Sequence, residues 1–238
     1  MLAARTTLAC KWVETLPVPQ VGTSLDDSAF GIAICLRLGI PPCTLERCAR
    51  CTKEVDNSTH GLRCRRCFGR IPRHSSINEE IKKALCSAHV PATREPLGLF
   101  SNQLRPDGVT LVPWRLGRYA CWDVTVVDTL ARSYLAATPT TEGMAASRAE
   151  GLKINKYVNL PTSYEFFPLA FETLGSMGEA TKAFIQELCR RIRESTGDPR
   201  APSQFLQRLS LEIVRGNACS IMGAMLPEAE YRNWPPDI

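Results

Sequence analysis

The stretch RPDGVTLVPWRLGRYACWDVT, residues 105–125, decides the fold expected for this chain. It holds two runs of strand-forming residues, one following Asp107 and one around Asp123, separated by the segment 115–118. That segment reads Arg-Leu-Gly-Arg, and its glycine makes it typical of a tight turn. A chain that folds back there forms an antiparallel pair and brings Asp107 close to Asp123.

Two carboxylates held close together repel each other unless a cation lies between them. Magnesium prefers oxygen ligands and is commonly bound by one or two carboxylates, so this pair predicts a Mg²⁺-type site. The alternative interpretation is that Pro-Asp-Gly at residues 106–108 forms an ordinary turn and that Asp123 faces solvent.

Size and composition indicate a globular protein. The chain has 238 residues, of which 44% are apolar and 22% charged, which is enough to form a substantial core. No apolar run is long enough to span a bilayer, so we expect no membrane association.

Periodic patterns on either side of the opening stretch predict an α/β fold. The expected core is a helix, three strands, a helix and a fourth strand, at residues 76–89, 93–100, the two strands within 106–127, 141–160 and 164–173. The helix between the last two strands permits them to pair in parallel. Two further helices are expected at residues 179–194 and 202–217.

We expect four segments along the chain. They are a helical lead-in (residues 1–42), a zinc knuckle with a basic segment (43–75), the α/β domain (76–217) and an irregular tail (218–238). The lead-in contains an unusually apolar helix that starts near Asp26 and stops at Gly39. Such a helix has to pack on the rest of this chain or on a partner domain.

Five of the eleven cysteines lie within residues 43–67. Cys48-x2-Cys51-x8-His60-x3-Cys64 has the ligand spacing of a small structural zinc site. Cys43 and Cys67 are alternatives to Cys64 as the fourth ligand. An odd number of cysteines, a clustered histidine and the lack of a signal peptide favour metal binding over disulfides.

The same part of the chain is basic. Residues 44–74 contain eight Lys or Arg and three acidic residues, and a concentrated basic patch indicates a polyanionic partner. The side chains that we expect to contact nucleic acid are Arg65, Arg66, Arg70, Arg73 and His74. His74 could instead cap the following helix.

Taken together, these motifs resemble the restriction-enzyme-like endonuclease region of non-long-terminal-repeat retrotransposons and similar reverse-transcriptase-type proteins. The resemblance covers most of the chain and is carried by the zinc knuckle, Arg73-His74, Arg105-Pro106-Asp107-Gly108, Trp122-Asp123-Val124-Thr125 and Lys153-x2-Lys156-Tyr157. It implies a PD-(D/E)XK nuclease fold and a Mg²⁺- or Mn²⁺-dependent nick in DNA that primes reverse transcription. It also implies a partner reverse-transcriptase domain, contact with DNA or the RNA of the element, and an intracellular, nuclear location.

By this resemblance, Asp107 and Asp123 fall on the two metal-binding acids. The general family pattern has a lysine two residues after the second acid, where this chain has Thr125. In the retrotransposon branch the lysine lies on the following helix, where both Lys153 and Lys156 match. A spacing of three residues places these two lysines on one helical face, and the choice between them stays open.

Two further acids are candidates by the same resemblance. Glu95 corresponds to an acid on the preceding strand that assists a second metal, and Glu172 lies on the last strand. Two other interpretations stay open beside a metal-dependent endonuclease: a non-enzymatic nucleic-acid-binding module and an inactive remnant of such an element.

Overall fold

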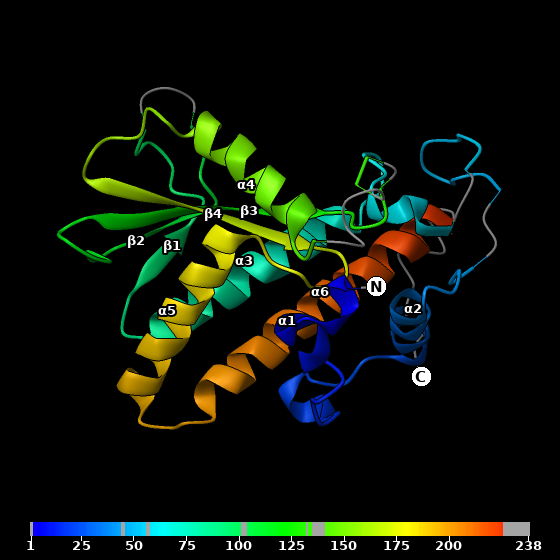
Figure 1. Ribbon diagram of the computed structural model, residues 1–238, viewed down its shortest axis with the longest axis horizontal. Helices are drawn as coiled ribbons and strands as arrows, with labels where there is room; N and C mark the ends of the chain where they lie inside the picture. Colours follow the sequence, from blue (N-terminus) through cyan, green and yellow to red (C-terminus); the bar gives the residue numbers. More distant parts are fainter. Residues whose placement is uncertain are drawn as a thin grey trace.

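The structure, a computed structural model, describes residues 2–43, 46–55, 58–100, 104–131, 133–134 and 141–225. In these residues a mixed sheet is covered by helices on both faces (Figure 1). Helix α4 (Met144–Lys156) lies on one face, and helices α3 (Arg70–Ser87) and α5 (Glu179–Thr196) lie on the other. The fold class is therefore α/β, as predicted.

The sheet has the strand order β1-β2-β3-β4. Strands β1 (Ala92–Arg94), β2 (Gly108–Thr110) and β3 (Tyr119–Val127) pair antiparallel. Strand β4 (Tyr164–Glu172) runs parallel to β3 along its whole length, and α4 makes the crossover between them. The predicted order of helix, three strands, helix and strand is confirmed, together with its parallel final pair.

The turn predicted at residues 115–118 closes the hairpin between β2 and β3. Leu116 and Gly117 have φ values of 48° and 72°, and the Arg118 N–H donates to the Arg115 carbonyl oxygen at 2.9 Å. Two successive residues with positive φ give a turn whose twist matches that of the flanking strands. The turn therefore returns β3 alongside β2 in the register that pairs Gly108 with Trp122.

The main apolar core lies between the sheet and helices α3, α5 and α6 (Ala201–Met225). Ala120, Trp122 and Val124 of β3 all belong to it. Because side chains alternate between the two faces along a strand, the odd-numbered residues of β3 face α4. Asp123 is thereby directed to the α4 side of the sheet.

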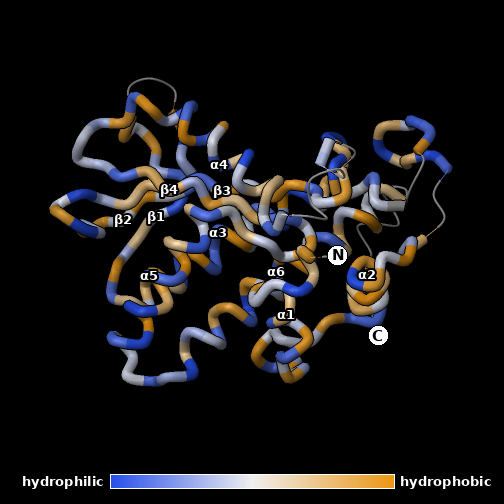
Figure 2. Tube along the Cα trace, in the orientation of Figure 1, coloured by the Kyte–Doolittle hydropathy of each residue, from blue (hydrophilic) through white to orange (hydrophobic). Residues whose placement is uncertain are grey.

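The lead-in segment comprises η1 (Ala3–Arg5), α1 (Thr7–Lys11), η2 (Pro19–Val21) and α2 (Asp27–Leu38). Helix α2 is largely apolar (Figure 2) and has the predicted ends, with the Asp26 carboxylate accepting from the Ala29 N–H at 2.9 Å. At the other end Gly39 adopts a φ of 74°.

Helix α2 packs on this chain, which answers the question that the sequence left open. Ala29, Ile32 and Leu36 are buried in one cluster with Ala218 and Ile221 of α6. Among the described residues, no helix combines the length and apolarity needed to cross a bilayer.

Two element boundaries in the first half of the chain differ from the prediction. Helix α3 begins at Arg70 instead of residue 76, and it follows Gly69, which offers no capping side chain. The strand expected over residues 93–100 is reduced to β1, because Glu95 adopts a φ of 48° and leaves the extended conformation.

The prediction of an irregular tail from residue 218 is wrong for residues 218–225, which continue α6 to Met225. Ala218 and Ile221 pack against Leu62 of the cysteine segment, and this burial stabilises the extra helical turns. The remainder of the expected tail, residues 226–238, lies outside the described residues.

Gly108 provides a test of the hairpin register. A Cβ atom at this position would collide with the buried Trp122 ring, so Gly108→Ala should lower the free energy of unfolding by about 1–3 kcal/mol. Gly151 on α4 is the matched control, because a Cβ atom there meets open space. Gly151→Ala should raise the free energy of unfolding by about 0.5–1 kcal/mol. Chemical denaturation measures both, and equal effects of the two substitutions would contradict the register.

Candidate metal centres

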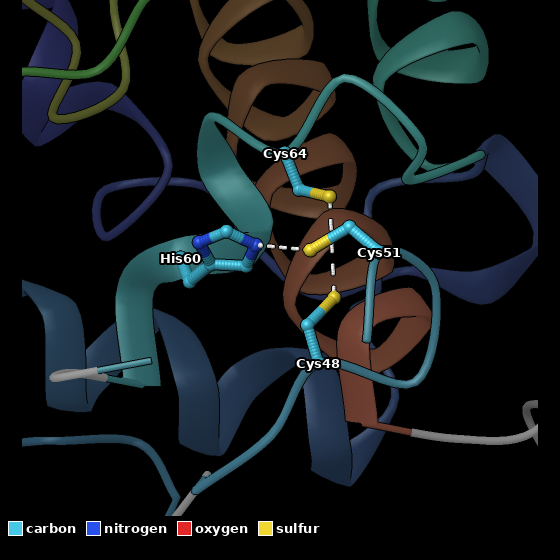
Figure 3. Close-up of side chains that lie close together, drawn as sticks. All are labelled: Cys48, Cys51, His60 and Cys64. Atoms are coloured by element: carbon cyan, nitrogen blue, oxygen red, sulfur yellow. Dashed lines mark hydrogen bonds between the residues drawn. The ribbon is translucent and has the colours of Figure 1, made fainter. Parts of the chain in front are cut away.

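Four side chains of the cysteine segment converge to form a Cys3His cluster, defined here as Cys48, Cys51, His60 and Cys64 (Figure 3). One potential ligand atom from each lies within 4.8 Å of all the others. The backbone brings them together in two turns, one closed by the Thr52 N–H donating to the Cys48 carbonyl and one by the Cys64 N–H donating to the His60 carbonyl.

The spacing of these ligand atoms fits a tetrahedral zinc ion. Cys48 Sγ lies 3.9 Å from Cys64 Sγ, and Cys51 Sγ lies 3.3 Å from His60 Nε2. With Zn–S bonds of about 2.3 Å, two sulfurs of a tetrahedral site are about 3.8 Å apart. The Arg50 backbone N–H also donates to Cys48 Sγ at 3.4 Å and holds this sulfur within the cluster.

Neither alternative cysteine belongs to the ligand group, although Cys67 is buried next to Cys48 and Cys64. Cys67 donates to the Ser220 carbonyl oxygen of α6 at 2.9 Å, and Cys43 packs against the apolar cluster of α2 and α6. The structure therefore groups Cys64, and neither alternative, with the other three residues of the Cys3His cluster. Burial raises the pKa of Cys64 to about 11, so its ionisation would depend on a bound cation.

A second group of potential ligands is formed by His74, Asp107 and Asp123, called here the His-Asp-Asp triad. Asp107 directly precedes β2, Asp123 lies within β3, and His74 lies on α3. One ligand atom from each lies within 4.8 Å of the other two. The hairpin and α3 thus bring together the two predicted aspartates and a histidine.

Asp107 is fixed by two contacts. Its Oδ2 atom accepts from the Val124 N–H at 2.6 Å and lies 2.9 Å from His74 Nε2. Burial opposes the ionised carboxylate, but the His74 hydrogen bond and charge outweigh it and lower the pKa of Asp107. The carboxylate is therefore available as an anionic oxygen ligand at neutral pH.

Asp123 is 4% exposed and is surrounded by donors from the end of α4. Lys153 Nζ lies 2.5 Å from Oδ1, and Lys156 Nζ lies 3.4 Å from Oδ2. The Tyr157 hydroxyl lies 2.7 Å from Oδ2, and burial raises its pKa, so it keeps its proton and donates. Both candidate lysines thus reach the second acid, and Lys153 makes the shorter contact.

His74 is a triad member whose role the sequence prediction missed. Burial disfavours the charged imidazole, but the hydrogen bond to Asp107 and the charge of Asp123 outweigh it and raise the pKa of His74. A metal ligand has to be the neutral imidazole, so a cation binding here would displace a proton. The sequence did contain a signal for this position of His74. His74 precedes the core residues Ile77 and Ile81 by three and seven positions, which places it on the same face of the helix.

Two further residues at the site carried no functional assignment from the sequence. Tyr157 stacks on Phe166, with 4.3 Å between the ring centroids, and its hydroxyl also contacts Asp123. Asn78 accepts from the indole N–H of Trp122 at 2.9 Å and donates to the His74 carbonyl at 3.2 Å. Asn78 therefore links the turn of α3 that contains His74 to Trp122 of β3.

The two additional acids are not brought to the triad. The Glu95 side chain is 77% exposed, and its carboxylate lies 3.7 Å from Arg94. Glu172 is fully buried, and its carboxylate accepts from the N–H groups of Ala145 and Ala146 at 3.0 and 3.3 Å. Glu172 thus satisfies the first turn of α4 rather than a cation.

Most of the predicted basic residues line a groove that runs from the cysteine segment to the triad. The groove has a volume of about 800 Å³, and its lining includes Arg50, Arg65, Arg66, Arg70 and His74. No acidic side chain of the described residues lines it. This groove, named here the basic groove, concentrates positive charge beside His74.

Arg73 also lines the basic groove, but its guanidinium is hydrogen-bonded inside the protein. Its side chain is only 2% exposed, and its guanidinium donates to Asn217 Oδ1 at 2.7 Å and to the Leu62 carbonyl oxygen at 3.3 Å. The guanidinium is therefore directed into the protein, in contrast to the exposed side chains of Arg65 and Arg66.

The Cys3His cluster can be tested by metal analysis. We expect the purified protein to hold about one equivalent of zinc and, after cobalt exchange, to show the spectrum of a tetrahedral thiolate site. Cys48→Ser and Cys64→Ser should lose the metal and the stability that it confers, because each removes a thiolate. Cys43→Ser is the matched control and should keep the metal. Full zinc retention by the Cys48 and Cys64 variants would contradict the assignment.

Comparison with known proteins identifies no family. No protein-family model matches the chain, and no curated protein is significantly similar to it. The structural findings that stand are an α/β fold, a Cys3His cluster that could hold zinc and a His-Asp-Asp triad that could hold a divalent ion.

Proposed function

We propose that this protein is a divalent-metal-dependent endonuclease that cleaves DNA phosphodiester bonds at the His-Asp-Asp triad. The observation that carries the proposal is the convergence of His74, Asp107 and Asp123 with Lys153 at one point beside the basic groove. The order of secondary-structure elements around this point agrees with the nuclease family that the sequence resembles.

The residues suit hydrolysis of a phosphodiester. Asp107 and Asp123 offer hard oxygen ligands, and His74 offers a nitrogen ligand, a set that accepts Mg²⁺ or Mn²⁺. A cation bound there would polarise a phosphoryl oxygen and lower the pKa of a bound water molecule. Lys153 would place a positive charge where negative charge develops on the phosphoryl group.

Lys153 is the better candidate of the two lysines. Its ammonium group lies 2.5 Å from Asp123 and neutralises that carboxylate. Lys156 lies 3.4 Å from Asp123, and its side chain is 48% exposed, compared with 24% for Lys153. A divalent cation bound to Asp123 would balance the same negative charge that Lys153 balances. Metal binding would therefore release Lys153 from Asp123 and allow it to face the substrate.

The basic groove supports a nucleic-acid substrate. Arginines hold phosphate groups through charge and hydrogen bonds without reading the base sequence. Because His74 is one of the groove's lining residues, a backbone bound along Arg65, Arg66 and Arg70 would lead toward the triad. From the resemblance to retrotransposon nucleases we further propose that the partner is DNA or the RNA of the element. We also propose that a reverse-transcriptase domain acts together with this chain and that the site of action is the nucleus.

A second candidate function is a nucleic-acid-binding module without catalysis. The observation that favours it is the set of donors on Asp123, which already neutralises the carboxylate without a metal. In that case the basic groove and the Cys3His cluster would bind DNA, and the triad would only stabilise the fold.

Site-directed variants test the nuclease directly. With Mg²⁺ or Mn²⁺, the protein should nick supercoiled plasmid, and Asp107→Asn or Asp123→Asn should slow nicking by on the order of 100-fold or more. Glu95→Gln is the matched control, because this acid lies outside the triad, and its nicking rate should be unchanged. Lys153→Met should slow nicking more than Lys156→Met.

Each variant has to retain the wild-type circular dichroism spectrum for the comparison to count. Cleavage by Asp107→Asn and Asp123→Asn at the wild-type rate would contradict the proposal. Salt-sensitive DNA binding without any metal-dependent cleavage by the wild type would support the non-catalytic module instead.

A further inference from the structure

The chain segments that carry the Cys3His cluster and the triad residue His74 pack on one helix. The C-terminal half of α6 carries Gly216, Asn217 and Ser220, and this stretch is contacted by Cys67 of the cysteine segment and by Arg73 of α3. Arg73, which immediately precedes the triad residue His74, lies at the centre of these contacts.

The cluster is packed on α6 at backbone level. A Cβ atom at Gly61 would collide with the Ser220 carbonyl, and one at Gly69 would collide with the backbone of Cys219 and Ser220. The Ala49 N–H and Arg50 Nε donate to the carbonyl oxygens of Ala224 and Gly223, both at 2.8 Å. These carbonyls lie in the last turn of α6, where a helix has no internal donors for them.

Arg73 connects the cysteine segment and helix α6 to helix α3. Its guanidinium donates to Asn217 of α6 and to the carbonyl of Leu62, which lies between the cluster ligands His60 and Cys64. Asn217 in turn donates to the Thr173 carbonyl, just after β4, at 2.6 Å. The Arg73 stem lies against Gly216, where a Cβ atom would strike it.

We propose that Arg73 is a positioning residue that holds His74 at Asp107 and Asp123 by anchoring helix α3 to the Cys3His loop and to helix α6. This inference rests on the proposed function, in which His74 is a ligand of the divalent ion. The buried charge of Arg73 needs its acceptors, so the helix cannot turn or slide without breaking them. Zinc binding orders the Cys3His loop, and the hydrogen bond from Arg73 to the Leu62 carbonyl links that loop to the triad.

The geometry also separates Arg73 from its neighbours in the basic segment. Arg65 and Arg66 are exposed and Arg70 is half-buried, whereas Arg73 has both ends of its guanidinium engaged inside the protein. A direct phosphate contact by Arg73 would require it to leave Asn217 and Leu62. Its part in the site is therefore indirect, through His74.

The test uses Mn²⁺ as the probe and the zinc-loaded full chain. Electron paramagnetic resonance measures free Mn²⁺ during a titration, and pulsed measurements detect the ¹⁴N modulation of a coordinated imidazole. The wild type should bind Mn²⁺ with ¹⁴N modulation from His74. Arg73→Met should keep zinc, bind Mn²⁺ about 10- to 100-fold more weakly, as is typical when a residue that orients a ligand is removed, and lose the modulation.

Lys82→Met is the matched control, because it removes a positive charge from the same helix outside the basic groove and should leave both readouts unchanged. Should Arg73→Met fail to fold, Asn217→Ser removes the side-chain acceptor of Arg73, together with the donor to the Thr173 carbonyl, and should weaken Mn²⁺ binding in the same direction. Removing zinc from the wild type should also weaken Mn²⁺ binding, and this effect should be smaller in Arg73→Met.

The positioning role would be overturned if Arg73→Met kept the wild-type Mn²⁺ affinity and ¹⁴N modulation. If Arg73→Met does not fold, the same result in Asn217→Ser would overturn it. Either result would leave the nuclease proposal standing. Absence of ¹⁴N modulation in the wild type would overturn both His74 ligation and this inference. Nicking activity is not a readout here, so the two failures are distinguishable.

Discussion

A carboxylate buried in the middle of a sheet is the constraint on which the triad depends. Asp123 is 4% exposed and lies on β3, which pairs with both β2 and β4. An unpaired charge in such a place would cost more than a domain's whole stability, so the carboxylate requires hydrogen-bonded partners of opposite charge. Lys153, Lys156 and Tyr157 supply them and thereby fix how α4 is rotated against the sheet.

The same constraint explains the charge balance at the site. Lys153 balances Asp123, and His74 balances Asp107. In the proposed enzyme a divalent ion replaces these balancing charges, since it satisfies both carboxylates at once and displaces the proton of His74. In this arrangement Lys153 and protonated His74 compete with the metal for the carboxylates of Asp123 and Asp107. Such competition suits an enzyme only if the displaced cation has a second role at the substrate.

Local signals in the sequence were sufficient for the hairpin and for the placement of α4. The turn at residues 115–118 carries its glycine where φ is positive, and the spacing of Lys153 and Lys156 puts both on the face that meets Asp123. His74 was assigned to the basic segment because α3 starts after Gly69 without a capping side chain to mark its first turn.

Residues whose partners are remote in sequence could not be placed. Glu172 caps α4 from 26 and 27 positions away, and Arg73 reaches Asn217 across 144 positions. The last turns of α6 depend on burial by Leu62, which no local pattern reports. The fold and the paired aspartates were therefore predictable, whereas the position of His74 beside them and the contacts of Arg73 with Asn217 and Leu62 arise only from tertiary packing.

The most direct test of this account is anomalous diffraction from crystals of the full chain grown with Mn²⁺. The account predicts a manganese peak about 2.0–2.5 Å from carboxylate oxygens of Asp107 and Asp123, with the His74 imidazole in the same coordination shell and Lys153 moved from Asp123. A triad without manganese at saturating concentration, with Lys153 still paired to Asp123, would contradict it.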